Sequence, residues 1–443
     1  MAVSFWMEQL GPEPERAALE GRVEADVCIV GAGYTGLWTA LELRRADPSV
    51  RVVVVEKETV GFGASGRNGG WVLGALVGSH AGWIARGGAD GAAALEAAIQ
   101  ATVDEVGRRV AEEGIDCDYV QGGTLTVAQS AVQLDRLRAQ QGESELLDAD
   151  VLAARIRVRG GVGALFSPHC ARVQPAKLVR GLAAAAERAG ATIHERTPAL
   201  TLESGRVRTP RGEVSARWII RATEGYTADL PGLRRLLAPV TSAMIATEPL
   251  SAAVWAELGW GGCESMLDGR NLYTYLQRTA DGRIALGGRG VPYVFGSGTA
   301  REFPPPPVIV ERLRERLRDL FGIDAKVAAA WQGVLGVSRT WRPAVGVDAA
   351  RGMGWAGGYA GDGVAASNLA ARTLRDLVLG RETELTALPW VGPLERSWEP
   401  EPFRYVGIHA VHRLLGAADA REASTGKASL FARVAGTISG RGH

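Results

Sequence analysis

The chain has 443 residues, of which 46% are hydrophobic and 22% charged, a balance typical of a globular protein with more than one domain. Its 50 Lys and Arg nearly cancel its 49 Asp and Glu, so the net charge of +1 gives no electrostatic basis for binding nucleic acid or an anionic membrane. Four scattered cysteines without a CxxC pair argue against a metal site or a disulfide framework, and we expect a cytoplasmic protein without a signal peptide or membrane helix.

The first pattern in the chain is a strand, a helix and a second strand. Apolar residues 26–30 end at a glycine and are typical of a buried parallel strand. Residues 34–45 are rich in helix formers and stop before Asp47-Pro48. The β-branched run at 52–56 predicts the next strand, and a helix crossing between two parallel strands gives a βαβ unit.

The rest of the chain mixes helical and strand patterns. In chain order we expect a glycine-dense loop at 60–71, a helix at 91–113, a strand at 122–128, a helix at 174–189, short strands over 191–222, further strands over 240–290, a proline-rich break at 302–307, a helix at 308–321, strands over 326–358 and a helix from 363 to about 379. The tail from residue 389 is rich in Pro and Trp and then helical, and we expect its polar end to be loosely held.

This order predicts an α/β (α+β) protein with a discontinuous Rossmann-type domain. We assign residues 20–80, 165–235 and 330–385 to the cofactor-binding domain. Residues 81–164 and 236–329 then form a β-rich substrate-binding domain, and 386–443 a C-terminal extension.

The pattern GxGxxG occurs three times, although about one match is expected by chance in a chain with 58 glycines. Only the match at Gly31, Gly33 and Gly36 follows a predicted strand, opens a predicted helix and precedes an acidic residue, Glu56, at the end of the next strand. In a dinucleotide site the first glycine makes the tight turn, the second admits the pyrophosphate and the third lets helix and strand pack closely. A glycine turn in an α/β domain without a ligand is the alternative.

The loop at 61–70 bears on which dinucleotide would bind, because FAD and NAD share the glycine fingerprint. It offers many backbone N–H groups and the polar side chains of Ser65, Arg67 and Asn68. We expect Arg67 to neutralise pyrophosphate charge and the glycines to lie against a flat ring. A flexible surface loop is the alternative.

These two motifs resemble the FAD-binding start of the D-amino-acid-oxidase superfamily, which includes glycine and sarcosine oxidases. The segments that carry the resemblance are DVCIVGAGYTGLWTALEL, VVVVEKETVGFGASGRNGG, ARVQPAKLV, RWIIRATEGYTADLP and WAGGYAGDGVAASNLAARTL. The chain is most similar to the branch of gamma-glutamylputrescine and aminophosphonate oxidoreductases, and the ASGRNGG run is the most specific sign of it. The resemblance covers about residues 20–380 and implies a glutathione-reductase/D-amino-acid-oxidase-like fold with bound FAD.

The resemblance also implies which residues hold FAD. The glycine turn meets the pyrophosphate, Glu56 the ribose, and Ala199 stands where the family usually has a valine beside adenine. A second loop, from Gly358 to Gly363, begins a helix whose positive end favours the reduced flavin. The implied cofactor residues are Gly31, Gly33, Tyr34, Thr35, Gly36, Glu56, Lys57, Ser65, Arg67, Asn68, Gly69, Gly70, Ala199, Ala222, Thr223, Gly358, Tyr359, Gly361, Asp362 and Gly363.

Two departures from the family pattern refine these expectations. Some relatives attach FAD through a cysteine near the last strands, but residues 334–346 contain none, so we expect non-covalent FAD. Sarcosine-oxidase relatives place a carboxylate-binding lysine where this chain has Ala365. That difference favours an amine without an α-carboxylate, unless Arg289, Arg339 or Arg342 supplies the cation.

The resemblance implies oxidation of a small primary or secondary amine to an imine by hydride transfer to flavin N5, with O2 as the expected acceptor and H2O2 as its product. The alternatives are an amino-acid oxidase of the glycine or sarcosine type, an amine dehydrogenase that reduces a quinone or a protein, and a flavin-binding sensor or subunit without turnover.

Four residues are candidates for the substrate pocket, where no strong acid or base is required. Tyr273 and Tyr275 lie two apart on a predicted strand and therefore share a face. Arg289 follows two glycines at a strand end, and Trp341 stands near the expected flavin ring. Packing of the aromatic side chains in the sheet and a solvated arginine are the alternatives.

Overall fold

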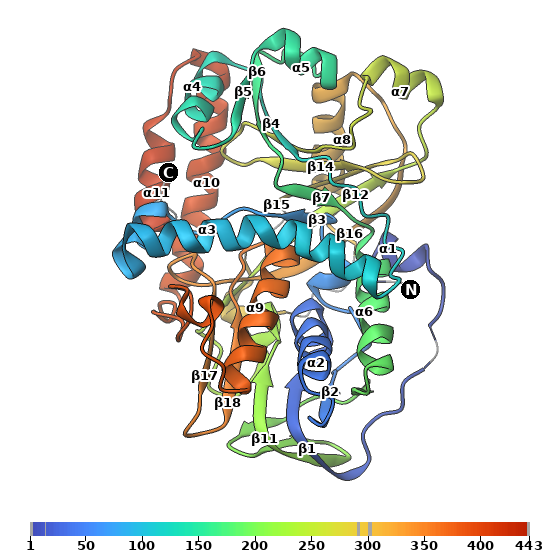
Figure 1. Cartoon of the computed structure of the whole chain (residues 1–443). Helices are drawn as coiled ribbons and strands as arrows, with labels where there is room; N and C mark the ends of the chain where they lie inside the picture. The colour runs from blue at the N-terminus through green and yellow to red at the C-terminus, as the bar shows by residue number, and fades with distance from the viewer. Residues whose placement is uncertain (1–2, 14, 290–292, 300–303, 441–443) are drawn as a thin grey trace.

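The computed structural model describes residues 3–13, 15–289, 293–299 and 304–440. Two mixed β-sheets lie one above the other in Figure 1, with helices against each of them. Among the described residues the helices are α1 (Phe5–Glu8), α2 (Tyr34–Ala46), α3 (His80–Glu112), α4 (Ala131–Ala139), α5 (Ala149–Arg155), α6 (Pro175–Arg188), α7 (Ala252–Leu258), α8 (Pro307–Phe321), α9 (Gly363–Val378), α10 (Phe403–Thr425) and α11 (Leu430–Ser439). Within this described part, every helix is too short or too polar to cross a bilayer.

The first sheet is the Rossmann-type half of the molecule. Its central strands run in the order β17-β18-β11-β1-β2-β8, and all neighbouring pairs except β17 and β18 are parallel. The strands are β1 (Gly21–Val30), β2 (Val52–Val55), β8 (Thr192–His194), β11 (Gly212–Arg221), β17 (Ala344–Asp348) and β18 (Met353–Gly357), with β9 (Thr201–Glu203) and β10 (Arg206–Thr209) as a ribbon on β11. The predicted βαβ unit is therefore present as β1, α2 and β2.

Alternation along β1 places apolar side chains on both faces of this sheet, as a buried parallel strand requires. Val27 and Ile29 join the main core beneath α2, α6 and α9. Cys28 and Val30 join a smaller core with side chains from β2, β10 and β11 on the opposite face. Both faces are covered, so the open edge available for a ligand is the carboxyl end of the strands.

The second sheet has the order β16-β12-β15-β14-β13-β4-β6-β5. Its strands are β4 (Thr124–Ala128), β5 (Glu145–Leu147), β6 (Gly163–Ser167), β12 (Ala238–Thr247), β13 (Ser265–Asp268), β14 (Thr274–Arg278), β15 (Ile284–Arg289) and β16 (Val327–Val337), and a separate pair is made by β3 (Trp71–Leu73) and β7 (Cys170–Arg172). One face packs against α8 through Leu313, Leu317 and Leu320. The alternate residues of β14, such as Tyr275, are outside that core and point to the opposite face.

Two of the boundaries drawn from the sequence fall inside strands of the second sheet. Residue 165 lies in β6, and residue 330 lies in β16, which pairs with β12 along its length. The helix predicted at 91–113 is the longer part of α3. Helical backbone already begins at His80, is interrupted at Gly88, where φ is +72°, and then continues to Glu112. This helix crosses the middle of the molecule in Figure 1 and packs on α9 in the main core.

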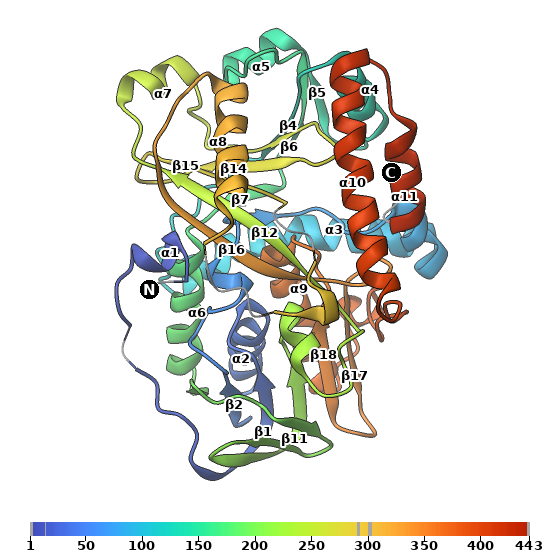
Figure 2. The same ribbon diagram turned by 180° about the vertical axis from the view of Figure 1, so that it is seen from behind.

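The end of the tail is helical, and the expectation of a loosely held end is wrong for residues 430–440. Ala432 and Ala435 on α11 are buried, and α11 packs against α10. Figures 1 and 2 both show this pair of helices, red in colour, beside α4 at the level of the second sheet. Small side chains at helical spacing allow this close packing, and composition alone did not indicate it.

Candidate functional site

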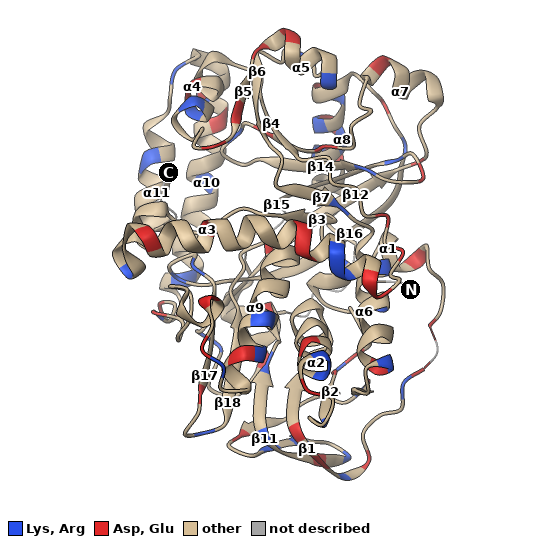
Figure 3. Cartoon of the chain, in the orientation of Figure 1, with Lys and Arg blue, Asp and Glu red and all other residues tan. Residues whose placement is uncertain are grey.

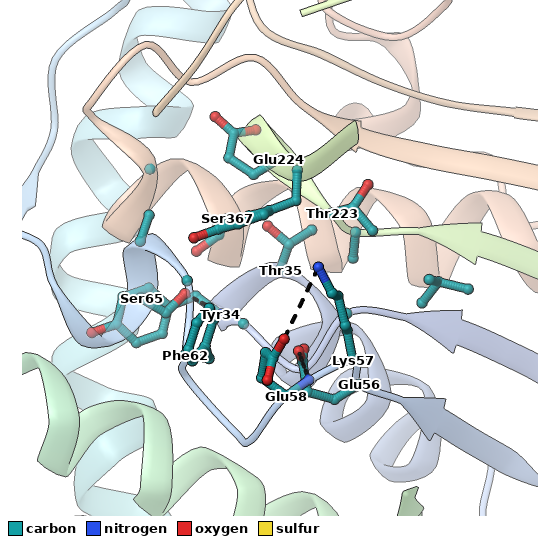
Figure 4. A pocket seen from close by; sticks show the side chains of 18 of the residues that line it. Tyr34, Thr35, Glu56, Lys57, Glu58, Phe62, Ser65, Thr223, Glu224 and Ser367 are labelled. Atoms are coloured by element: carbon teal, nitrogen blue, oxygen red, sulfur yellow. Dashed lines mark hydrogen bonds and ion pairs between the residues drawn. The ribbon is translucent and has the colours of Figure 1, made fainter. Parts of the chain in front are cut away.

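A cavity of about 310 Å3 lies at the carboxyl ends of β1, β2 and β11. This is the edge at which dinucleotides bind to Rossmann-type sheets. Figure 4 shows its side chains converging from the glycine turn, the end of β2 and the start of α9. The predicted cofactor residues that line it are Gly31, Gly33, Tyr34, Thr35, Glu56, Lys57, Ser65, Asn68, Ala199, Ala222, Thr223, Tyr359, Gly361 and Gly363.

The glycine turn has the geometry that a dinucleotide needs. Gly31 has φ of +110°, and a Cβ there would lie 2.6 Å from the carbonyl oxygen of Ala222, so only glycine fits without strain. A Cβ on Gly33 would lie 2.9 Å from Ser65 Oγ at the cavity wall. Gly36 does not line the cavity; a Cβ there would lie 1.9 Å from the carbonyl oxygen of Gly31, so glycine is needed for α2 to start this close to the turn.

Glu56 directly follows the end of β2 and lines the first cavity. Its carboxylate accepts hydrogen bonds from the backbone N–H of Ala32 at 2.8 Å and of Glu58 at 3.0 Å. Burial raises the pKa of this carboxyl, and the two N–H donors act in the opposite direction. The neighbouring Lys57 forms an ion pair with Glu58 at 4.0 Å, drawn in Figure 4.

The loop at 61–70 is rigidly built. Ser65 Oγ accepts the backbone N–H of Tyr34 at 2.8 Å, and Asn68 Oδ1 accepts that of Gly70 at 2.7 Å. Asn68 Nδ2 donates to the carbonyl of Ser65 at 2.9 Å, so the loop folds around this amide. The alternative of a flexible surface loop is therefore wrong.

Arg67 does not meet the expected pyrophosphate position. Its side chain is 3% exposed and lines neither this first cavity nor a second, adjoining cavity of about 560 Å3. Its guanidinium donates to the carbonyls of Phe62 at 2.8 Å and Gln332 at 3.2 Å, and its Cζ lies 4.6 Å from the Phe62 ring centroid. The arginine therefore ties the loop to β16 instead of facing the ligand cavity.

Gly70 and Gly358 also lie outside both cavities. Gly70 has φ of +73° beside Gln277, and Gly358 has φ of +82° and donates its N–H to Glu224 at 2.8 Å. Ala199 lines the first cavity from the segment between β8 and β9, not from a strand as expected.

The N-terminal segment donates hydrogen bonds to the backbone of the loop at 61–70. Trp6 is 1% exposed and donates its Nε1–H to the carbonyl of Asn68 at 2.9 Å. Ser4 Oγ donates to the carbonyl of Gly66 at 2.6 Å. Phe5 stacks on Trp331, whose Nε1–H donates to the carbonyl of Arg67 at 2.9 Å. The adjacent aromatic residues Phe5 and Trp6 are the sequence signal for this support.

Glu224 is a further cavity residue that sequence reasoning missed. It follows β11 with φ of +42° and accepts N–H groups of Gly358 at 2.8 Å, Gly336 at 3.2 Å and Tyr359 at 3.3 Å. Burial raises the pKa of this carboxyl to about 7. It joins the end of β11 to β16 and to the loop before α9, and Figure 4 shows it above Thr35 and Ser367.

A second cavity of about 560 Å3 lies between the two sheets and the C-terminal helices. It shares Asn68, Leu335, Gly361 and Val364 with the first cavity, so the two spaces adjoin. The predicted residues that line it include Gly69, Asp362, Tyr273, Tyr275 and Trp341.

Tyr275 is held by polar and aromatic contacts in the wall of the second cavity. Its hydroxyl lies 2.9 Å from Ser242 Oγ, and its ring meets Trp71 edge-on at 6.0 Å between centroids. Burial raises the pKa of Tyr275 to about 12, so the phenol stays protonated at neutral pH. The expectation that Tyr273 and Tyr275 share a face agrees with their common presence in this cavity wall.

The three arginines considered as carboxylate ligands occupy different places. Arg339 lines the second cavity but bonds to both carboxylate oxygens of Glu399, at 2.9 and 3.0 Å. Arg342 lies outside both cavities and pairs with Glu395. Arg289 ends β15, and its side chain lies outside the described residues.

The residues of the two cavities fit FAD. The glycine turn and the N-termini of α2 and α9 supply backbone N–H groups and positive helix ends toward the first cavity, which suits a pyrophosphate. Gly361, which lines both cavities, adds no side chain of its own where they adjoin. The adjoining space between Asn68 and Val364 suits a flat ring system that reaches from one cavity to the other.

Comparison with known proteins bears on this fit. The family model described as "FAD dependent oxidoreductase" (DAO) matches residues 26–377. The OrdL oxidoreductase of Haemophilus influenzae is 31% identical over 382 residues, which are 82% of this chain and 84% of that protein. The gamma-glutamylputrescine oxidoreductase of Escherichia coli is 31% identical over 385 residues, 82% of this chain and 85% of that protein.

Solved structures agree on the fold. Glycine oxidase from Geobacillus kaustophilus has a TM-score of 0.71 at 22% identity, with 84% of this chain and 99% of that chain covered. L-proline dehydrogenase from P. horikoshii has a TM-score of 0.68 at 16% identity, with 84% and 98% covered.

Proposed function

Because the chain belongs to the DAO family of FAD-dependent oxidoreductases, we propose that it oxidises a small primary or secondary amine that lacks an α-carboxylate. The observation that carries this proposal is that the arginines lining the second cavity already have carboxylate partners within the protein. Arg339 and Arg404, the arginines that line it, already bond to Glu399 and Glu401. A substrate carboxylate would have to displace one of these partners, whereas a neutral amine would not.

The position that would hold a carboxylate-binding lysine in sarcosine-oxidase relatives supports the same choice. It is Ala365, which is fully buried inside α9. The gamma-glutamylputrescine oxidoreductase relative is named for an amine substrate, and the glycine oxidase relative for an amino acid. The paired arginines favour the amine for this chain.

In the proposed reaction the α-carbon of the amine loses a hydride, the nitrogen loses a proton, and water then converts the imine to a carbonyl compound and ammonia or a smaller amine. Bound FAD would take up the hydride and pass two electrons to an acceptor, for which we propose O2 reduced to H2O2. No cysteine is among the described residues lining the two cavities, which supports non-covalent attachment of FAD.

The protein's part in this reaction is to position the amine and exclude water. Trp71, Tyr275 and Trp341 would enclose the reacting carbon in apolar surroundings, which favour the uncharged amine over its ammonium form. The phenol of Tyr275, held by Ser242, would offer a hydrogen-bond partner to the amine nitrogen. This arrangement uses orientation and desolvation and needs no general base.

The experiment is to purify the protein and to release the flavin from one portion with acid. In a second portion, the absorbance of the bound flavin is followed anaerobically after addition of alkylamines, polyamines, aminophosphonates, glycine or sarcosine. We expect alkylamines or polyamines to bleach the flavin, and H2O2 to form when air is admitted. Bleaching by glycine or sarcosine alone would contradict the amine assignment. Bleaching by an amine without H2O2 in air would instead support a dehydrogenase, and no bleaching by any compound would support a flavin-binding protein without turnover.

A further inference from the structure

The C-terminal segment from Trp398 to Ser439 forms one side of the second cavity. Ten of the thirty residues that line this cavity come from it, although the family model ends at residue 377. Figure 2 shows α10 running from the level of α4 down toward the first sheet, so it spans both halves of the molecule. We call α10, α11 and the turn between them the C-terminal hairpin.

The hairpin is fixed to the second sheet by two buried carboxylates. Asp419 accepts the backbone N–H groups of Asn271 at 2.8 Å and Leu272 at 3.0 Å, in the loop that leads directly to Tyr273. Glu422 pairs with Arg136 of α4 at 3.1 Å. Asp419 and Glu422 are each 6% exposed, so both interactions are shielded from solvent and stronger than surface pairs.

The other end of the hairpin is fixed beside the cofactor half. The carbonyl of Ser439 accepts hydrogen bonds from Trp341 Nε1 and Arg339 Nη1, both at 3.2 Å. Trp398, just before α10, donates to the carbonyl of Val337 at 2.7 Å, and Arg404 donates to that of Arg234 at 3.1 Å. The segment is therefore anchored at both ends where it lines the cavity.

The surface that the hairpin turns toward the cavity has more apolar side chains than polar ones, and the polar ones are those of Arg404, His412 and Ser439. Ile408, Val411 and Ile438 line it, together with the aromatic ring of Phe403. Val411 also borders a smaller cavity of about 270 Å3 between the hairpin and the second sheet, which shares Tyr273 and Trp341 with the larger one. Polar side chains line this smaller cavity beyond Val411, among them Arg136, Asp268, Arg270 and Asn271. The space that begins at the expected flavin edge therefore continues past Val411.

We propose that the C-terminal hairpin determines substrate specificity by selecting amines with an apolar substituent and that Val411 limits the length of that substituent. The inference rests on the proposed amine oxidation and adds the substrate class. The apolar wall favours a hydrocarbon or aromatic group, and the Arg339–Glu399 pair removes the cation that a carboxylate would need.

The test compares propylamine and phenethylamine as probes, in FAD-loaded protein. Val411→Trp should lower kcat/KM for phenethylamine at least about tenfold and change that for propylamine less than about threefold, because the larger ring shortens the space. Val411→Ala should shift the ratio toward phenethylamine. Val406→Trp is the matched control, since Val406 is on the same helix, 60% exposed and outside the cavity wall.

A second arm examines the ion pair. Glu399→Gln removes the negative charge that pairs with Arg339, so sarcosine should perturb the flavin spectrum of this variant at concentrations at least about tenfold lower than in the wild type. Flavin content and thermal unfolding of each variant show whether the fold is retained.

The outcomes separate the two proposals. Wild-type protein that responds to the amines, with a propylamine-to-phenethylamine ratio that neither Val411 variant changes, overturns the role of the hairpin and leaves amine oxidation standing. A Val406→Trp effect as large as that of Val411→Trp also overturns it. Wild-type flavin that responds to none of the amines overturns the proposed function and this inference together.

Discussion

Replacing Glu56 with Gln tests the cofactor site at the residue with the clearest geometry. The carboxylate accepts two backbone N–H groups, at 2.8 and 3.0 Å. A glutamine can accept only one of them, and its own NH2 would face the other donor. A hydrogen bond to a charged group contributes about 1.5–3 kcal/mol, and the ribose would also lose its charged acceptor. We therefore expect the Kd for FAD to rise about 10- to 100-fold.

The assay is a titration of the apoprotein with FAD, followed by flavin fluorescence, with urea unfolding of the apoprotein to separate damage to the fold. Glu20→Gln is the control, because Glu20 lies outside both cavities, its side chain is 77% exposed and it forms an ion pair with Arg211 at 3.6 Å. Such a pair contributes about 0–1 kcal/mol, so FAD affinity should change less than about threefold. Equal affinity of wild type and Glu56→Gln for FAD would refute the assignment of Glu56 to the ribose.

Three further substitutions follow from the structure. Burial raises the pKa of Glu224 from 4.5 to about 7, so the folded state binds its proton more tightly than the unfolded state. The stability of the wild-type apoprotein relative to Glu224→Gln should therefore fall as pH rises from 4.5 to about 7, by at most about 3 kcal/mol in urea unfolding. Parallel pH profiles of the two proteins would contradict this. Trp6→Ala removes a buried ring and its hydrogen bond to Asn68, so we expect the free energy of unfolding in urea to fall by about 3–5 kcal/mol and the FAD complex to weaken. An unchanged Kd for FAD would show that this support is dispensable. Gly36→Val places a side chain against the carbonyl of Gly31, so the purified variant should carry little or no flavin, whereas full flavin loading would disprove the close crossing of α2 and β1.

The features of the fold that sequence predicts well are those encoded within a few residues. The βαβ unit at 26–56 was predictable because strand, glycine turn, helix and acidic residue follow one another in a fixed order. The helices at α6, α8 and α9 begin and end close to the expected positions for the same reason. The boundaries near 165 and 330 were misplaced because strand pairing joins distant segments, and β16 pairs with β12 about ninety residues earlier.

The candidate site was predictable in its cofactor part and less so elsewhere. Motif positions placed most of the expected residues around the first cavity, but Arg67 faces the carbonyls of Phe62 and Gln332. A motif gives the type of residue and its place in the loop, whereas the direction of a long side chain depends on its neighbours in space. Glu224 was missed because its three N–H donors come from two later segments of the chain, β16 and the loop before α9.

The segments before and after the family match contact different parts of the molecule: the first contacts the loop at 61–70, and the second lines the second cavity. The match covers residues 26–377 and includes the glycine turn, the loop at 61–70 and the start of α9. Before it, Trp6 supports the loop at 61–70; after it, the C-terminal hairpin closes the second cavity and fixes Trp341 through Ser439. Changes in the hairpin can therefore alter the second cavity without altering the residues that surround the first. We expect chains with the same cofactor motifs and different hairpins to differ in the amine they accept more than in their affinity for FAD.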